Sequence, residues 1–192
     1  NIHQHLDLIA GLPYEDYESF RSSFNEVYEM RPQQLQLGFL KVLKGSHMME
    51  CVEEYGISYK SFEPYEVLST RWLSYGEILK LKTVETMVEV YYNSGQFQYT
   101  LKYLEKFFPD AFGFYEALGD FYERKGYLEV SHSRLRRYEI LLEFLTECEE
   151  ISRHKTEELM IYDLYLRENI KSRPSFAPSQ KEYEKEIWTF RR

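Results

Sequence analysis

Three polar side chains, His3, His5 and Asp7, alternate through a short apolar segment close to the first residue. Residues two apart on a β-strand point to the same face, so a strand here would present all three together. Two imidazoles and a carboxylate are ligands that a divalent metal accepts, but no further ligand cluster completes the set. The other interpretation is that these side chains line the interior of a barrel or face a neighbouring segment.

Asp7 is of particular interest because it interrupts the apolar run from Leu6 to Ala10. A carboxylate without a partner is costly in an apolar strand, so Asp7 should face a polar cavity or a fixed partner. The run ends at Gly11 and Pro13, and parallel α/β folds bind ligands where their strands end. Asp7 is therefore either a ligand contact or a cap for a neighbouring loop.

The elements that would position Asp7 form a strand–helix–strand–helix unit. Residues 3–10 are predicted to form a buried strand, and residues 35–43 a second one. Between them lies the apolar stripe of an amphipathic helix, at Tyr17, Phe20, Phe24 and Val27. Ser46 can cap a second helix, which is predicted to run through Cys51 to Tyr55 with Gly56 as its stop. Strands joined through a helix in this way are parallel.

The rest of the chain has a helical pattern. Residues 57–73 are predicted to connect the two parts, and apolar stripes then predict helices from Ser74 to Ile170. The spacing of Tyr91 and Tyr122 is shorter than a tetratricopeptide repeat, so the glycines that follow them are interpreted as C-caps of helical hairpins. The expected fold class is α+β, mostly α.

Two segments resemble a known family. Asp7-Leu8-Ile9-Ala10-Gly11-Leu12-Pro13 resembles the D-L-I-x-G-L-P strand of radical S-adenosylmethionine proteins that carry a cobalamin-binding domain, often labelled Fe–S oxidoreductases. The stretch from Pro32 to Ser46 is similar to their next strand, and Glu53-Glu54-Tyr55-Gly56 to its continuation. The resemblance implies that 1–56 are the last βα units of a partial (β/α) barrel, followed by a helical domain at 57–172 and a linker with a charged tail at 173–192.

The same resemblance implies a cofactor site. An acidic residue at the position of Asp7 contacts the ribose or amino acid part of S-adenosylmethionine. Ile9, Gly11 and Leu12 would shape the pocket, and Leu43 would lie near the adenine. The parent protein would use S-adenosylmethionine, a [4Fe–4S] cluster and cobalamin, for methyl transfer or an oxidative rearrangement.

The chain departs from this family at several points. Lys44 stands where relatives usually have Pro, and Tyr14 where they often have Gly. Its only cysteines, Cys51 and Cys148, do not form the C-x-x-x-C-x-x-C motif that holds the cluster, and two thiols are too few. We therefore expect a C-terminal fragment that binds no cofactor and catalyses nothing by itself. The alternative is a non-catalytic helical module that binds a partner protein through exposed aromatic residues.

The charge and the apolar content of the chain limit the kinds of partner that it is expected to bind. The chain has 24 basic and 32 acidic side chains and a formal charge of −8, which argues against nucleic-acid binding. The local basic group Arg134, Arg136 and Arg137 stands among acids and is predicted to be an ion-paired surface. No apolar run reaches the roughly 20 residues that span a bilayer. We expect a cytoplasmic protein with an unidentified small-molecule or macromolecular substrate, able to dimerise through exposed strand edges.

Overall fold

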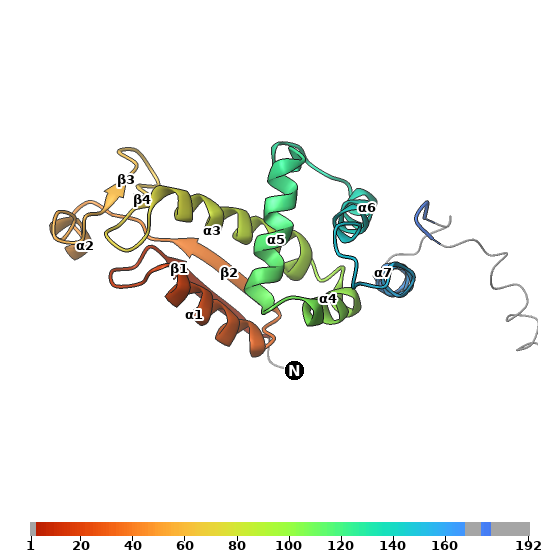
Figure 1. Ribbon diagram of the computed structural model, residues 1–192. Coiled ribbons are helices and arrows are strands. Elements are labelled where there is room, and N and C mark those ends of the chain that lie inside the picture. Colours follow the sequence, from red (N-terminus) through yellow and green to blue (C-terminus); the bar gives the residue numbers. More distant parts are fainter. Residues whose placement is uncertain (1–2, 168–173, 178–192) are drawn as a thin grey trace, which may run out of the picture. The chain divides into compact units, whose positions relative to one another are not determined.

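The computed structural model describes residues 3–167 and 174–177, and the fold is α+β and mostly helical, as the sequence predicts (Figure 1). The chain divides into two compact units. The first comprises the residues up to Gly95 together with Phe108–Lys125, and the second comprises Gln96–Phe107 and the residues from Gly126 onward. The two units are described separately below.

The first unit begins with a β–α–β arrangement. Strand β1 (His5–Ala10) is followed by helix α1 (Tyr17–Glu29) and strand β2 (Gln34–Phe39). Asp16 caps α1, because its Oδ1 accepts a hydrogen bond from the Ser19 amide at 2.9 Å. The two strands pair in parallel over their whole length, from His5↔Gln34 to Ala10↔Phe39, which confirms the predicted direction.

The sheet has two different faces. Paired residues of a parallel ladder lie on the same face, and alternate residues on opposite faces. One face carries an apolar set: Leu6, Leu8, Ala10, Leu35, Leu37 and Phe39. Ala10 and all three β2 residues in this set are buried, whereas Asp7, Ile9 and Gln36 on the other face are exposed. The first face therefore belongs to the core, and we call the second the outer face.

Beyond β2 the structure differs from the sequence prediction. The second strand ends at Phe39 rather than residue 43, because the chain then pairs with a hairpin made of β3 (Ser58–Tyr59) and β4 (Val67–Ser69). The amide of Val42 donates to the carbonyl of Tyr65 at 2.9 Å, and that of Val67 to the carbonyl of Leu40 at 2.8 Å. The predicted connection at 57–73 is thus partly a hairpin.

The helix predicted from the Ser46 cap through Tyr55 is shorter than expected. Ser46 does cap a helix, but this helix, α2, spans His47–Glu50 and residues 51–55 form turns. Gly56 has a φ of +59°, but it follows these turns and does not end the helix, so the predicted stop was wrong. The prediction was wrong about where the helix ends. Only four residues after the Ser46 cap are helical, and the turns that follow bring the chain to the hairpin.

Two long helices complete the first unit. Helix α3 (Tyr75–Met87) starts with a capping box between Ser74 and Glu77 and continues into a π-helical segment, η1 (Val88–Asn93). Helix α5 (Ala111–Arg124) packs against α3. Their contact is close at Gly119, where a Cβ atom would lie 2.6 Å from Cγ2 of Thr83. Glycine is needed at this position because no side chain fits.

Aromatic side chains fill the core between α1 and α5. Phe24 of α1 contacts the rings of Phe112 and Tyr115 of α5, with centroid distances of 5.4 and 6.1 Å. The hydroxyls of Tyr28 and Tyr115 are 2.8 Å apart and hydrogen bonded within this core. These buried rings stabilise the core, because each removes a large apolar surface from water.

The second unit contains α4 (Gln98–Leu104), η2 (Glu105–Phe107), η3 (Tyr127–Glu129), α6 (Arg134–Leu145) and α7 (Arg153–Arg167). Its α4 has no side-chain cap of its own. Instead Asp163 of α7, only 3% exposed, accepts hydrogen bonds from the amides of Tyr99 and Thr100 at 3.0 and 2.8 Å. A buried carboxylate with such partners holds α4 against α7.

Gly95 and Gly126 both follow helical segments with φ values of +61° and +69°. This left-handed geometry confirms the prediction that they act as C-caps. The predicted domain boundaries, 1–56, 57–172 and 173–192, stay predictions; the compact units group α3 and α5 with the first sheet. The predicted charged tail at 181–192 lies outside the described residues.

Candidate functional site

The outer face of the sheet brings together two of the predicted cofactor residues, Asp7 and Ile9. The Asp7 side chain is 66% exposed, and its Oδ1 lies 3.0 Å from Nε2 of His5. The same His5 nitrogen is 3.1 Å from Oε1 of Gln36, the residue paired with Asp7 across the ladder. Among the residues that the structure describes, Asp7 stands beside an imidazole and an amide on an open polar face, with no loop amide as its partner.

The other three predicted residues lie at the carboxyl-terminal ends of the two strands. Gly11 directly follows β1 with a φ of +87°, and a Cβ there would come within 2.8 Å of Val67 Cγ1. Leu12 comes next and is exposed, and so is Leu43, in the loop between β2 and α2. Gly11 is thus required for the turn, while Leu12 and Leu43 offer apolar surface at this end.

The two edges of the sheet are unlike. The carbonyls of Gln4 and Ala10 accept hydrogen bonds from Gln34 and Leu40, so the even-numbered residues of β1 point their peptide groups toward β2. Those of His5, Asp7 and Ile9 consequently point to the opposite edge. In the part of the chain that the structure describes, nothing pairs with this edge of β1. We call it the open edge.

The outer edge of β2 is closed by a side chain. The residue is Asn93, the last residue of η1. Its Oδ1 accepts a hydrogen bond from the Leu35 amide at 2.9 Å, and its Nδ2 donates one to the Leu35 carbonyl at 2.8 Å. The Asn93 amide therefore bonds to Leu35 as a residue of a neighbouring strand would. Its Nδ2 also donates to Glu89 at 2.8 Å, which fixes its orientation. Within the described residues, the outer edge of β2 is thus capped at Leu35, whereas the edge of β1 stays open.

An aromatic cluster at the carboxyl-terminal end was not predicted from the sequence. Tyr14 has a φ of +68°, which is uncommon for a bulky residue, and its ring centroid lies 4.7 Å from that of Trp72 and 5.8 Å from that of Tyr55. Burial and the neighbouring Glu54 raise the pKa of Tyr55. The sequence signal for this cluster was the departure at Tyr14, but its partners come from distant turns.

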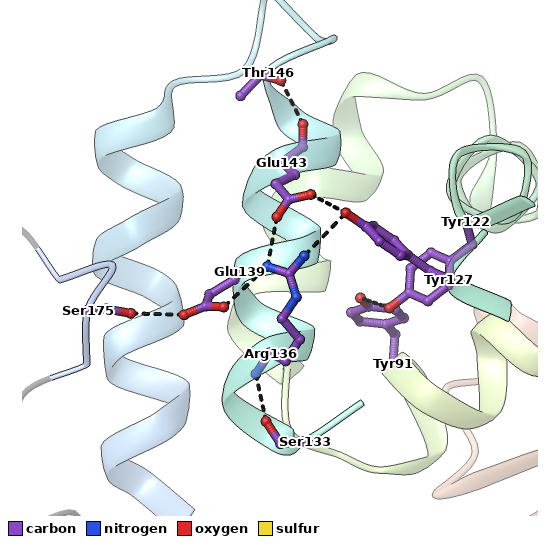
Figure 2. Close-up of polar contacts among 9 residues, drawn as sticks. All are labelled: Tyr91, Tyr122, Tyr127, Ser133, Arg136, Glu139, Glu143, Thr146 and Ser175. Carbon is purple, nitrogen blue, oxygen red and sulfur yellow. Dashed lines mark hydrogen bonds and ion pairs between the residues drawn. The ribbon is translucent and has the colours of Figure 1, made fainter. Parts of the chain in front are cut away.

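A polar cluster in the second unit is a separate candidate. Arg136 bonds to Glu143 at 2.7 Å and to Glu139 at 3.2 Å, and the Tyr127 hydroxyl joins Arg136 to Glu143 (Figure 2). The hydrogen bond to Glu143 raises the pKa of Tyr127. Ser175 donates to Glu139 at 2.9 Å. The predicted ion-paired surface around Arg136 is thus confirmed.

A pocket of about 270 Å³ lies beside this cluster. It is lined by Arg136, Glu139, Leu142, Glu143, Thr146, Arg153 and Phe176. Its four charged side chains are bonded to one another or, for Arg153, to Glu157 at 2.8 Å. Because those bonds would have to break for a charged ligand to bind, the pocket is a weaker candidate than the outer face.

The residues present do not fit an iron–sulfur cluster. Cys51 and Cys148 are the two cysteines of the chain and belong to different compact units. Such clusters need three or four thiolates in one place. No group of three or more His, Cys, Asp and Glu side chains within 3–167 and 174–177 is arranged to hold a metal ion, so His3, His5 and Asp7 do not form the metal site considered above.

The fold and these sites define a mostly helical α+β protein with a short parallel sheet whose outer face is polar and open. Residues 53–191 match the family described as a protein of unknown function, DUF4080, and the chain therefore belongs to that family. The match begins after β2, so the five predicted cofactor residues lie outside it. No match was found among curated proteins. Of the helices within the described residues, none is both long and apolar enough to cross a membrane.

Proposed function

We propose that this chain is the C-terminal part of a cobalamin-dependent radical S-adenosylmethionine Fe–S oxidoreductase or methyltransferase, in which β1 and β2 are the last strands of a partial (β/α) barrel. The observation that carries the proposal is the match of the Asp7–Pro13 motif to an exposed polar face. A strand with this motif places Asp7 on the outer face and Gly11 in the turn that follows it.

The position of α1 supports the proposal. The crossover helix of a β–α–β unit covers one face of the sheet, and in a barrel that face is the outside. Here α1 buries Phe20, Phe24 and Tyr28, and the core face of the sheet is buried with them. The face that α1 does not cover, which is the outer face with Asp7 and Ile9, would then point into the interior of the complete barrel. Enzymes of this architecture bind substrates and cofactors there.

The chemistry of the outer face suits an adenosyl ligand. The Asp7 carboxylate can accept hydrogen bonds from ribose hydroxyls or from an α-ammonium group, and His5 at 3.0 Å orients it. Ile9 and Leu12 supply apolar contact. S-adenosylmethionine, when bound to a reduced cluster, supplies the radical in this class of enzyme; the present residues would bind and orient it.

The chain would not be competent alone, because its two cysteines cannot hold the cluster. The remaining strands and the three cluster thiolates would come from sequence that pairs with the open edge of β1. The helical domain expected at 57–172 would cover the barrel mouth or bind the substrate, which is either a small molecule or a macromolecule. The open edge also allows two copies of the chain to dimerise.

The proposal is tested on the protein extended by the sequence encoded before Asn1. That sequence should contain a C-x-x-x-C-x-x-C motif, and the extended protein, reconstituted with iron and sulfide, should bind S-adenosylmethionine in calorimetry. Asp7→Ala should weaken this binding about tenfold, the effect of losing one charge-assisted hydrogen bond. Glu26→Gln is the matched control, because Glu26 is an exposed acid on α1.

Absence of the cysteine motif would overturn the assignment to this enzyme class. If the motif is present and the Asp7→Ala protein binds S-adenosylmethionine as tightly as the parent, the role of Asp7 is wrong while the class stands. Both variants should unfold at the same denaturant concentration as the parent chain, since both positions are exposed.

A second candidate function, a protein-binding module, is favoured by exposed aromatic residues in the second unit. Tyr99 of α4 and Tyr162 of α7 contact each other edge to face with centroids 4.9 Å apart, and both are about half exposed, as are Tyr165 and Leu166. Exposed aromatic residues of this kind are common anchors of interfaces. If the upstream sequence lacks the cysteine motif, Tyr162→Ala should abolish capture of a partner that Asp7→Ala leaves intact.

A further inference from the structure

A cysteine, a histidine and a glutamate come together at α2, outside the outer face. The Cys51 sulfur lies 3.6 Å from Nε2 of His47, and Nδ1 of the same imidazole lies 3.1 Å from Oε2 of Glu50. The three residues lie within about one helical turn, at positions 47, 50 and 51, directly after the Ser46 cap. This is the order of contacts, thiol to imidazole to carboxylate, found where a base activates a nucleophile.

The chemistry of the contacts fixes the imidazole tautomer. An ionised Glu50 carboxylate can only accept a hydrogen bond, so Nδ1 of His47 carries the proton that it shares. Nε2 is then left with its lone pair toward the Cys51 thiol. A neutral imidazole in this state can take the thiol proton, and the resulting imidazolium stabilises the thiolate beside it.

Access to the pair comes from the histidine side. The His47 side chain is 85% exposed, whereas Cys51 is 8% exposed. The exposed imidazole, 3.6 Å from the sulfur, marks the side from which a small reagent would have to approach the buried cysteine. The buried backbone position keeps the thiol near His47.

Cys148 provides an internal comparison. It is more exposed than Cys51, but burial and the neighbouring Glu147 raise the pKa of its thiol. A thiol in such surroundings is a poor nucleophile at neutral pH. On exposure alone Cys148 would react faster, so the two cysteines distinguish activation by His47 from simple access.

We propose that Cys51, His47 and Glu50 form a modification site for low-molecular-weight disulfides. His47 takes the thiol proton at Nε2, and the Cys51 thiolate attacks one sulfur of the disulfide. A mixed disulfide forms at Cys51, the original S–S bond breaks, and the leaving thiolate takes up the proton from His47. The disulfide is the oxidant, and no other reactant is needed. The proposal is independent of any cofactor on the outer face.

The test uses a chromogenic dipyridyl disulfide at neutral pH on the Cys51→Ser and Cys148→Ser variants, which report the two thiols separately. Cys51 should react faster than Cys148. In the Cys148→Ser background, His47→Gln should slow the reaction about tenfold, less than a fully enclosed general base contributes, because His47 is exposed. The control is His154→Gln, which removes an exposed imidazole paired with Glu158 on α7 and should leave the rate unchanged.

A readout that a purely structural role would not move is rescue by free imidazole. Added imidazole should restore the rate of a His47→Gly variant, since it can supply the missing base, and should not accelerate Cys148. Equal rates for Cys51 and Cys148, an unchanged rate in His47→Gln, or the absence of imidazole rescue would each overturn the proposal. Mass spectrometry after incubation with glutathione disulfide should place the adduct on Cys51.

Discussion

The two edges of the small parallel sheet differ in their hydrogen bonding. At the outer edge of β2, the Asn93 side chain bonds to both peptide groups of Leu35 at 2.9 and 2.8 Å. At the open edge of β1, no described segment pairs with His5, Asp7 and Ile9. Exposed edges invite pairing with other strands, so a fold that closes one edge with a dedicated side chain leaves the other as the place for addition.

The difference teaches which way the sheet can extend. Asn93 is held by Glu89 at 2.8 Å and stands at the end of a π-helical segment, a geometry that sets its side chain against β2. An added strand on that side would have to displace it. The open edge of β1 needs no such rearrangement. The first two predictions below use this contrast, and the predictions follow in order of expected effect.

The largest effect should come from proline at position 36. The Gln36 amide points toward β1, so Gln36→Pro removes a ladder hydrogen bond and leaves a β1 carbonyl without a donor, costing about 3 kcal/mol of unfolding free energy. Asp7→Pro is the matched variant, because the Asp7 amide points to the open edge. Its cost should be clearly smaller by urea denaturation. Equal costs would show that the edge of β1 is already paired in this chain.

The second-largest effect is expected from a substitution at Asn93, which caps the outer edge of β2. Asn93→Ala removes both bonds to Leu35 and should cost about 2 kcal/mol, since partly buried peptide groups lose their partners. The control is Gln33→Ala, because Gln33 accepts the amide of Gln4 at 2.7 Å in an exposed loop. That variant should lose less than about 0.5 kcal/mol. A similar loss in both would mean that Asn93 does not seal the edge.

A smaller effect concerns pH and the carboxylates beyond β2. Burial opposes ionisation of Glu66, but hydrogen bonds from Lys82 and Lys60 outweigh it, and its pKa lies below the ordinary 4.5. Glu66 thus stabilises the fold above about pH 4.5, and this contribution is lost as the pH falls through its folded-state pKa. Burial instead raises the pKa of Glu85, so its stabilising contribution is lost as the pH rises.

The two glutamine variants should therefore respond with opposite signs. In thermal unfolding at pH 7, Glu66→Gln should lower the melting temperature and Glu85→Gln should raise it. Both differences should shrink as the measurement is repeated at lower pH, through the folded-state pKa of each carboxyl group. A Glu85→Gln variant that melts lower at pH 7 would contradict the burial of that carboxylate.

The smallest effect on stability is expected on the outer face. Asp7→Asn and Gln36→Ala change exposed side chains and should alter the unfolding free energy by less than about 0.5 kcal/mol each. A loss above that size, measured by urea denaturation, would assign Asp7 a structural role. The comparison sharpens the proposal, because a residue that the fold does not need but that weakens S-adenosylmethionine binding acts on the ligand.

Much of the fold could be predicted from local patterns. The Ser46 cap, the apolar stripe of α1, and the left-handed glycines Gly95 and Gly126 after helical segments are short-range features, and each is observed. The parallel pairing of β1 and β2 follows from the helix between them. The placement of Asp7 and Ile9 on one face follows from alternation alone.

What could not be predicted depends on contacts between distant residues. The β3–β4 hairpin is two and three residues per strand, too short for a periodic signal. Asn93 closes β2 from 58 residues away, and nothing in its local sequence marks that role. The ring cluster of Tyr14, Tyr55 and Trp72 arises only because three turns meet. The local sequence therefore predicts which residues form strands, but it does not predict what bonds to each edge of the sheet.

The account is tested most directly by amide hydrogen exchange along β1, read residue by residue by NMR. In this chain at low concentration, the amides of Leu6 and Leu8 should be protected by pairing with β2, while those of His5, Asp7 and Ile9 exchange quickly. In the protein extended by its upstream sequence, all five should be protected, because a further strand then pairs with the open edge. Fast exchange of His5, Asp7 and Ile9 in the extended protein would contradict the barrel assignment.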